Sequence, residues 1–126
     1  MAYNTISQMD FGQAIASEDL TGKLYFLGAQ VGETVGVNTT AGGAANVVIH
    51  TDSPSGIAVR TVFKGITKAV AGAAIAADAD LASDAAGKVV TAATGDVVVG
   101  KAITAAGEEN EVITINFFGD GRRTAA

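Results

Sequence analysis

Short runs of valine and isoleucine recur along this chain, separated by alanine, glycine and aspartate. The pattern is densest between residues 68 and 118, where brief apolar runs alternate with turn-forming residues. Turn signals that return about every 8–12 residues are typical of β-sandwiches and β-barrels. We therefore predict an all-β fold, a small β-sandwich or β-barrel-like domain.

Side-chain alternation marks individual strands, because successive side chains of a strand point to opposite faces of its sheet. Residues 23–27 alternate in this way, so that Tyr25 and Leu27 would share one face. Further strands are predicted near residues 47–49, 88–92 and 96–102. The last predicted strand, residues 111–118, places Ile113, Ile115 and Phe117 on one face. In the half-buried strand predicted over residues 57–64, one face is formed by Ile57, Val59, Thr61 and Phe63.

Residues 69–82 are rich in alanine, which favours helix. Gly72 interrupts the run, and Asp78 and Asp80 lie near its end. A short helical turn and an irregular loop are equally compatible with this composition. We therefore expect a short irregular or helical insert in the β-rich domain.

Three segments follow from these patterns: an N-terminal arm over residues 1–19, a β-rich domain over residues 20–118, and a short C-terminal tail over residues 119–126. The first segment is polar, and its isolated apolar residues follow neither helical nor strand periodicity for long. It is either a frayed terminus or an extended arm that docks on a partner. We favour the arm, and we predict partner contacts at Tyr3, Ile6, Met9 and Phe11.

The composition excludes several classes of function. The net charge is −5, and the lysines are scattered, which argues against direct binding of nucleic acid. Cysteine is absent, so disulfides and thiolate metal sites are excluded. No apolar run approaches the roughly 18 residues that a membrane span needs. The first residues lack the basic head and apolar run of a signal peptide. Much of the hydrophobic content is alanine, which buries little area, so we expect a small core that a partner would help to stabilise.

Candidate chemical groups are few. His50 is the single histidine, and we interpret it as a surface residue at the end of a strand. Asp78, Asp80 and Asp84 most simply form a solvated acidic turn, and whether they bind a cation stays open. No glycine cluster has the context of a phosphate-binding loop. We predict no catalytic residue, no cofactor and no enzymatic activity. In the tail, Arg122 and Arg123 form either a mobile end or an ion-pair contact with an acidic partner.

Four short segments occur in an order that resembles a known family. They are EDLTGKLY at residues 18–25, AGAAIA at residues 71–76, DAAGKV at residues 84–89 and VGKA at residues 99–102. Together they are similar to the capsid cement, or head decoration, proteins of tailed bacteriophages, long catalogued as a domain of unknown function. The resemblance covers roughly residues 18–118. Members often have Gly-Asp after the Ala-Ile-Ala-Ala run, whereas this chain has Asp78-Ala79-Asp80 after Ala77.

The resemblance implies a β-rich protein on the outer surface of the phage head, made in the bacterial cytoplasm. Such proteins bind the major capsid protein after shell expansion and brace the shell. They form homo-oligomers, most often trimers and sometimes dimers, and the family defines no catalytic or ligand-binding residues. Our leading hypothesis is therefore a virion protein that cements capsid subunits. The alternatives are a carrier domain of the biotinyl or lipoyl type and a module associated with a tail or fibre. A small hydrolase lacks a supporting pair of nucleophile and base.

Overall fold

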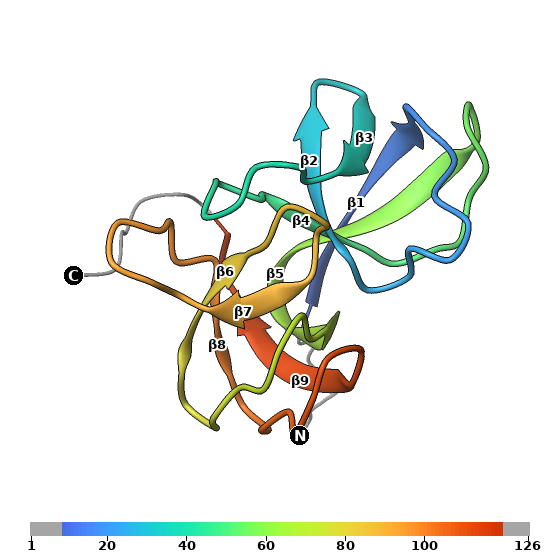
Figure 1. Ribbon diagram of the computed structural model, residues 1–126. Helices are drawn as coiled ribbons and strands as arrows, with labels where there is room; N and C mark the ends of the chain where they lie inside the picture. The colour runs from blue at the N-terminus through green and yellow to red at the C-terminus, as the bar shows by residue number, and fades with distance from the viewer. Residues whose placement is uncertain (1–8, 120–126) are drawn as a thin grey trace, which may run out of the picture.

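A computed structural model describes residues 9–119, with side chains from residue 12 onward, and these residues form strands and no helix (Figure 1). The predicted all-β fold is thereby confirmed. The strands are β1 (Met9–Ala16), β2 (Leu27–Val31), β3 (Thr34–Val37), β4 (Val47–Ile49), β5 (Ala58–Val70), β6 (Asp80–Ser83), β7 (Val89–Thr91), β8 (Gly100–Ala102) and β9 (Val112–Phe117).

The N-terminal half of the fold is a closed ring of strands. The hydrogen-bonded order is β1-β3-β2-β4-β5, and β1 pairs again with β5, which closes the barrel. The C-terminal half continues from β5 through β9, β8, β6 and β7. The last strand of this second group, β7, is joined to the segment just after β5 by a parallel bridge between Val89 and Ala71. The two groups appear as two lobes that share β5 (Figure 1).

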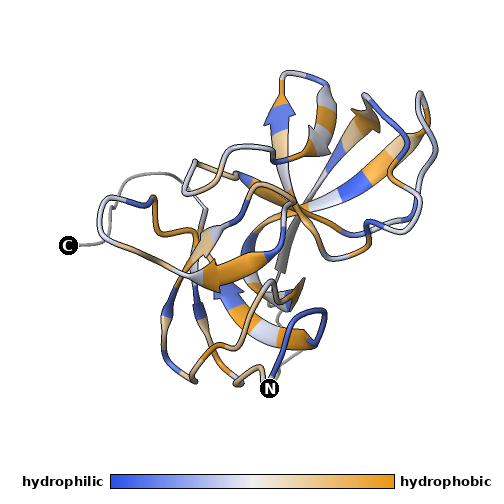
Figure 2. Ribbon diagram, viewed as in Figure 1, coloured by the Kyte–Doolittle hydropathy of each residue, from blue (hydrophilic) through white to orange (hydrophobic). Residues whose placement is uncertain are grey.

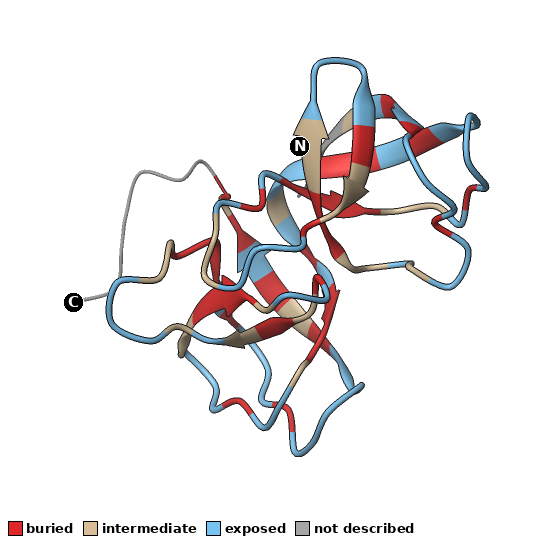
Figure 3. Cartoon of the chain, turned by 45° about the horizontal axis from the view of Figure 1, so that its top comes forward, coloured by how far each residue is buried: buried red, intermediate tan, exposed pale blue. Residues whose placement is uncertain are grey.

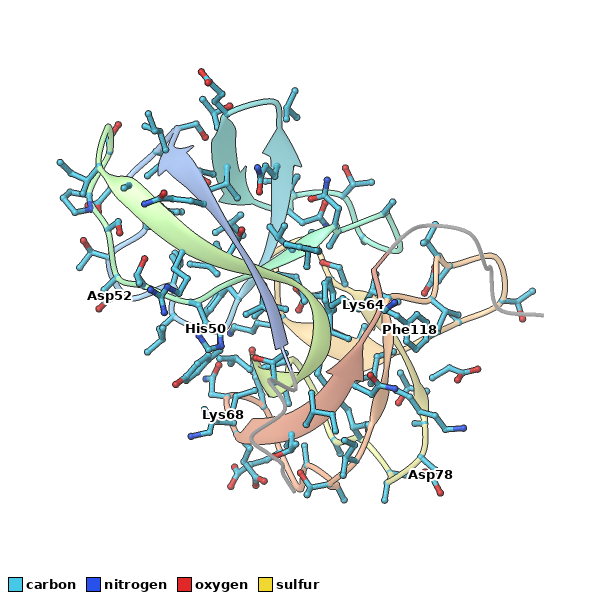
Figure 4. All side chains as sticks on the ribbon, turned by 180° about the vertical axis from the view of Figure 1, so that it is seen from behind. His50, Asp52, Lys64, Lys68, Asp78 and Phe118 are labelled. Atoms are coloured by element: carbon cyan, nitrogen blue, oxygen red, sulfur yellow. The ribbon has the colours of Figure 1, made fainter. Side chains whose placement is uncertain are left out.

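β5 is the longest strand and belongs to both lobes. Val62 pairs with β1 and β4 at once, and Gly65 pairs with β1 and β9 at once. Therefore β1 occupies one edge of β5, while β4 and β9 follow each other along the other edge. The register against β1 skips Phe63, so this residue forms a bulge, and bulges bend a strand. Gly65 follows with a φ of 121°, which only glycine adopts readily. Together these two residues give β5 the curve seen in Figure 4.

Two hydrophobic cores lie on opposite sides of β4. Val47 and Ile49 pack in the N-terminal core with Leu20, Val35 and Val59, whereas Val48 packs in the C-terminal core. All three residues of β4 are buried. Figure 3 shows buried residues, in red, where the two lobes meet. Hydrophobic residues recur in both lobes (Figure 2). Most buried residues are valine or alanine, and Phe117 is the largest side chain that the described residues bury fully.

The structure differs from the sequence-based expectation in four places. Residues 96–99 of the strand predicted over residues 96–102 lie outside β8, which begins at Gly100. Residues 21–25 form turns, and the strand begins only at Leu27. Phe63 is exposed because it forms the bulge, and Ile57 is exposed because it lies before β5, which begins at Ala58. Of the four residues predicted to share one face, only Val59 and Thr61 are buried. Residues 9–16 of the predicted arm form β1, a strand of the barrel. Of the insert predicted over residues 69–82, residues 71–79 are irregular, one of the two expected forms, whereas residues 69–70 belong to β5 and residues 80–82 to β6.

The two lobes pack closely against each other at Gly87. Its carbonyl accepts a hydrogen bond from the Leu27 N–H at 2.6 Å, and its φ is +80°. A Cβ atom at Gly87 would lie 2.8 Å from the Leu27 carbonyl oxygen and 2.6 Å from Val37 Cγ1. Gly95 has a similar φ of +89°, but a Cβ atom there would meet nothing within 4 Å.

We predict that Gly87→Ala destabilises the protein more than Gly95→Ala. Both variants lose about 1–2 kcal/mol for the left-handed backbone, and the overlap at Gly87 costs about 1–3 kcal/mol more. Urea denaturation followed by circular dichroism measures the two free energies of unfolding. Equal losses in the two variants would show that close packing between the lobes does not limit stability.

Candidate interaction site

A hollow of about 340 Å³ lies where the end of β5 returns to the end of β4. His50 follows β4 directly, and Tyr25 lies in the turn before β2. Figure 4 shows His50 and Lys68 on the same side of the molecule, with Asp78 at a distance from them. The hollow is lined by Tyr25, His50, Ile66, Thr67, Lys68 and Thr114.

His50 connects two distant points of β5. Its backbone N–H donates to the Arg60 carbonyl at 2.8 Å, and its Nε2 lies 2.9 Å from Thr67 Oγ1. Seven residues of a straight strand would span roughly 23 Å. One histidine therefore reaches both positions only because β5 is curved. Thr67 is 4% exposed, so its hydroxyl positions His50 and is not open to a substrate as a nucleophile would be.

Tyr25 adopts an unusual backbone conformation, with a φ of 69°. This region is costly for residues other than glycine and persists where the surroundings hold it. The Tyr25 N–H donates to the Ile49 carbonyl at 2.8 Å, and the Tyr25 carbonyl accepts from the Val70 N–H at 3.3 Å. These two bonds fix the turn between β4 and the end of β5. The two bonds therefore hold the strained Tyr25 backbone in place and keep its ring at the hollow.

The ring of Tyr25 contacts two basic side chains. The His50 ring meets it edge-on, with centroids 5.3 Å apart and planes at 71°. Lys68 Nζ lies 5.8 Å from the centre of the same ring, within the range of a cation–π contact. Burial lowers the pKa of His50, and the positive charges of Arg60 and Lys68 lower it further. His50 is therefore neutral at pH 7, and Lys68 supplies the positive charge among the residues that line the hollow.

The structure describes the backbone of two of the six predicted contact residues. Tyr3, Ile6, Arg122 and Arg123 lie outside the residues that the structure describes. In β1, the backbones of Met9 and Phe11 pair with Gly65 and Val62 of β5. Their roles in partner contact stay predictions.

The acidic residues near the start of β6 are engaged locally or dispersed. Asp84 Oδ1 accepts from the Ala86 N–H at 2.9 Å and from the Lys88 N–H at 2.8 Å, which shapes its own turn. Asp78 lies in a turn with a φ of 68°. Within residues 9–119, no three His, Cys, Asp or Glu side chains group closely enough to hold a metal ion. The same residues contain no helix with the length and apolarity of a membrane span.

Sequence reasoning placed His50 at a strand end, which the structure bears out, but it did not select Tyr25, Thr67, Lys68 or Thr114. Tyr25 lies in a turn, Thr67 and Lys68 lie on β5, and Thr114 lies on β9, so tertiary structure alone brings them together. The one available signal was the single histidine directly after an apolar triplet. A histidine in that position marks a strand end but does not identify its partners.

We predict that stability falls as the pH is lowered from 7 to 5, and that His50 accounts for much of this. The folded pKa of His50 is depressed, so below the ordinary value near 6.5 the unfolded chain binds the proton first. The loss begins below that value and is complete below the folded pKa. Urea denaturation at several pH values should show a flatter profile for His50→Gln, and parallel profiles would contradict the assignment. NMR titration of the imidazole measures the pKa directly.

Comparison with known proteins gives a structural neighbour. No protein-family model and no curated protein sequence matches the chain. Among solved structures, the N base of the head fiber gp8.5 of bacteriophage phi29 is similar in fold. The similarity covers 86% of this chain and 93% of that one, with a TM-score of 0.69 and 18% sequence identity. At that identity the comparison shows that the two chains share a fold.

Proposed function

We propose that this chain is a structural protein of a tailed-bacteriophage virion, bound to the outer surface of the head. In this role it contacts the major capsid protein and braces neighbouring shell subunits. The observation that carries the proposal is the shared fold with the phi29 head fiber base, which extends over nearly all of both chains. The sequence segments that resemble head decoration proteins point independently to the same class.

The architecture suits a role in contact. Its two lobes share β5 and are joined by β4, whose residues pack in both cores. When copies are joined in the proposed homo-oligomer, several weak contacts with the shell act together and give firm retention. Nothing in the described site favours the alternative of a biotinyl or lipoyl carrier. That alternative predicts a cofactor-sized increase in the intact mass of the native protein.

One end of the N-terminal barrel exposes apolar side chains. We call Ile15, Val31 and Ile57 the apolar tip; they are 46%, 77% and 53% exposed. The Ile15 N–H bonds to the Glu33 carbonyl, and the Ala16 N–H bonds to the Ile57 carbonyl, so these segments adjoin. Clustered exposed apolar residues are typical of protein–protein contacts. The tip supports association with other copies of this chain.

We predict that removing residues 2–8 abolishes binding to heads that lack this protein and leaves the domain folded. The deletion takes away Tyr3 and Ile6 but keeps every described strand, since β1 begins at Met9. Cosedimentation with heads from a phage deleted for the gene measures binding, and circular dichroism checks the fold. Arg122→Ala with Arg123→Ala tests the tail in the same assay.

Full occupancy of heads by the truncated protein would refute the role of the arm. If the intact protein also fails to bind heads and is absent from purified virions by mass spectrometry, the proposed function fails.

We predict a homo-oligomer, with a trimer favoured over a dimer, whose assembly depends on the apolar tip. Val31→Asp places a charge on the most exposed residue of the tip and should shift the mass in light scattering toward the monomer. Ile103→Asp is the matched control, because Ile103 is 45% exposed and lies just after β8 in the other lobe. Equal effects of the two substitutions would argue against the tip as the contact.

A further inference from the structure

The hollow beside Tyr25 combines a positive charge, a hydroxyl and apolar walls. Among the residues that line it, Lys68 is charged and none is acidic. Within the described part of the chain, Lys68 Nζ contacts the Tyr25 ring but forms no ion pair, and the Thr114 hydroxyl makes no hydrogen bond. Two donors at the hollow therefore lack an acceptor among the described residues.

Strand pairing brings these two donors together. Lys68 of β5 lies directly opposite Thr114 of β9. The Thr114 carbonyl accepts from the Ile103 N–H at 2.9 Å, so its backbone faces the side of β8 and not β5. Lys68 and Thr114 thus form a non-hydrogen-bonded pair, in which facing side chains lie closest. One small acceptor can meet the lysine ammonium and the threonine hydroxyl at once.

The surrounding charge favours an anionic acceptor. Arg60 and Lys68 of β5 both act on His50 with their positive charges, and β5 carries no acidic residue, although the chain as a whole has a net charge of −5. Tyr25 and Ile66 supply apolar walls, and Ile66 is 38% exposed. Partial removal of water strengthens an ion pair relative to one on an open surface. The volume of about 340 Å³ is at the small end for binding sites, which suits one side chain.

We propose that this hollow binds the carboxylate of an aspartate or glutamate side chain from a shell subunit. The carboxylate accepts from Lys68 Nζ and from the Thr114 hydroxyl, and its methylene groups lie against Tyr25 and Ile66. The neutral His50, held by Thr67, fixes the position of the Tyr25 ring. This inference rests on the proposed function, because the partner is a protein of the head.

Head binding by variants of exposed lysines tests the proposal. Lys68→Gln should weaken binding at least tenfold and flatten its dependence on salt, while Lys68→Arg should retain most of the affinity. Lys101→Gln is the matched control, since Lys101 is also an exposed strand lysine but lies on β8 outside the hollow. Thermal unfolding confirms that each variant is folded. Equal affinities for Lys68→Gln and Lys101→Gln, with the native protein bound, would overturn the inference and leave the proposed function standing.

A second measurement needs no head. Glutamate blocked at both ends, titrated into the labelled protein, should shift the NMR signals of Tyr25, His50 and Lys68 and raise the pKa of His50. Blocked glutamine, the neutral control, should shift none of them. No response to blocked glutamate would overturn the site even if heads bind. A free acidic sugar such as glucuronate that binds more than tenfold tighter would overturn the assignment to a protein side chain.

Discussion

The curvature of β5 is the constraint on which the rest of the structure depends. If β5 were straight, it could not pair with the strands of both lobes, and neither group of strands could close around a core. The bulge at Phe63 and the left-handed Gly65 bend the strand where its partner on one edge changes from β4 to β9. His50 then bonds to Arg60 and Thr67, on either side of the bend. The curve is thus produced locally and held by His50, which directly follows β4.

The two cores are coupled through the short strand β4. Val48 faces one core while Val47 and Ile49 face the other, so the strand has no solvent side. Burial of each such side chain contributes about 1.5–3 kcal/mol, and a shift of β4 would disturb both cores together. This coupling explains how a core rich in valine and alanine supports two lobes. The C-terminal core includes Leu27, Val48 and Val62, which come from strands of the N-terminal barrel.

The alternation of apolar and polar residues predicted the strands that pair without interruption. It failed where the backbone forms a bulge or a left-handed turn. In β9, Ile113, Ile115 and Phe117 all point inward as expected, because that strand is flanked evenly by β5 and β8. Tyr25 was placed in a strand because its neighbours alternate, yet its left-handed turn is set by bonds to Ile49 and Val70, far away in sequence. The hollow could not be predicted for the same reason, since its residues meet only after β5 has curved.

The strained turn at Tyr25 has a consequence for binding. Its backbone is held at both ends, and its ring is held by His50 and Lys68, so the wall of the hollow is fixed before any partner arrives. Fixing a site in advance lowers the entropy lost on association. The same cationic strand opposes an approach by the same face of another copy, because like charges across an interface are costly. Under the proposed function, an acidic shell subunit meets no such penalty. The charge of β5 would then separate the proposed contact with the shell from the proposed association between copies, which uses the apolar tip on the other side of the bend.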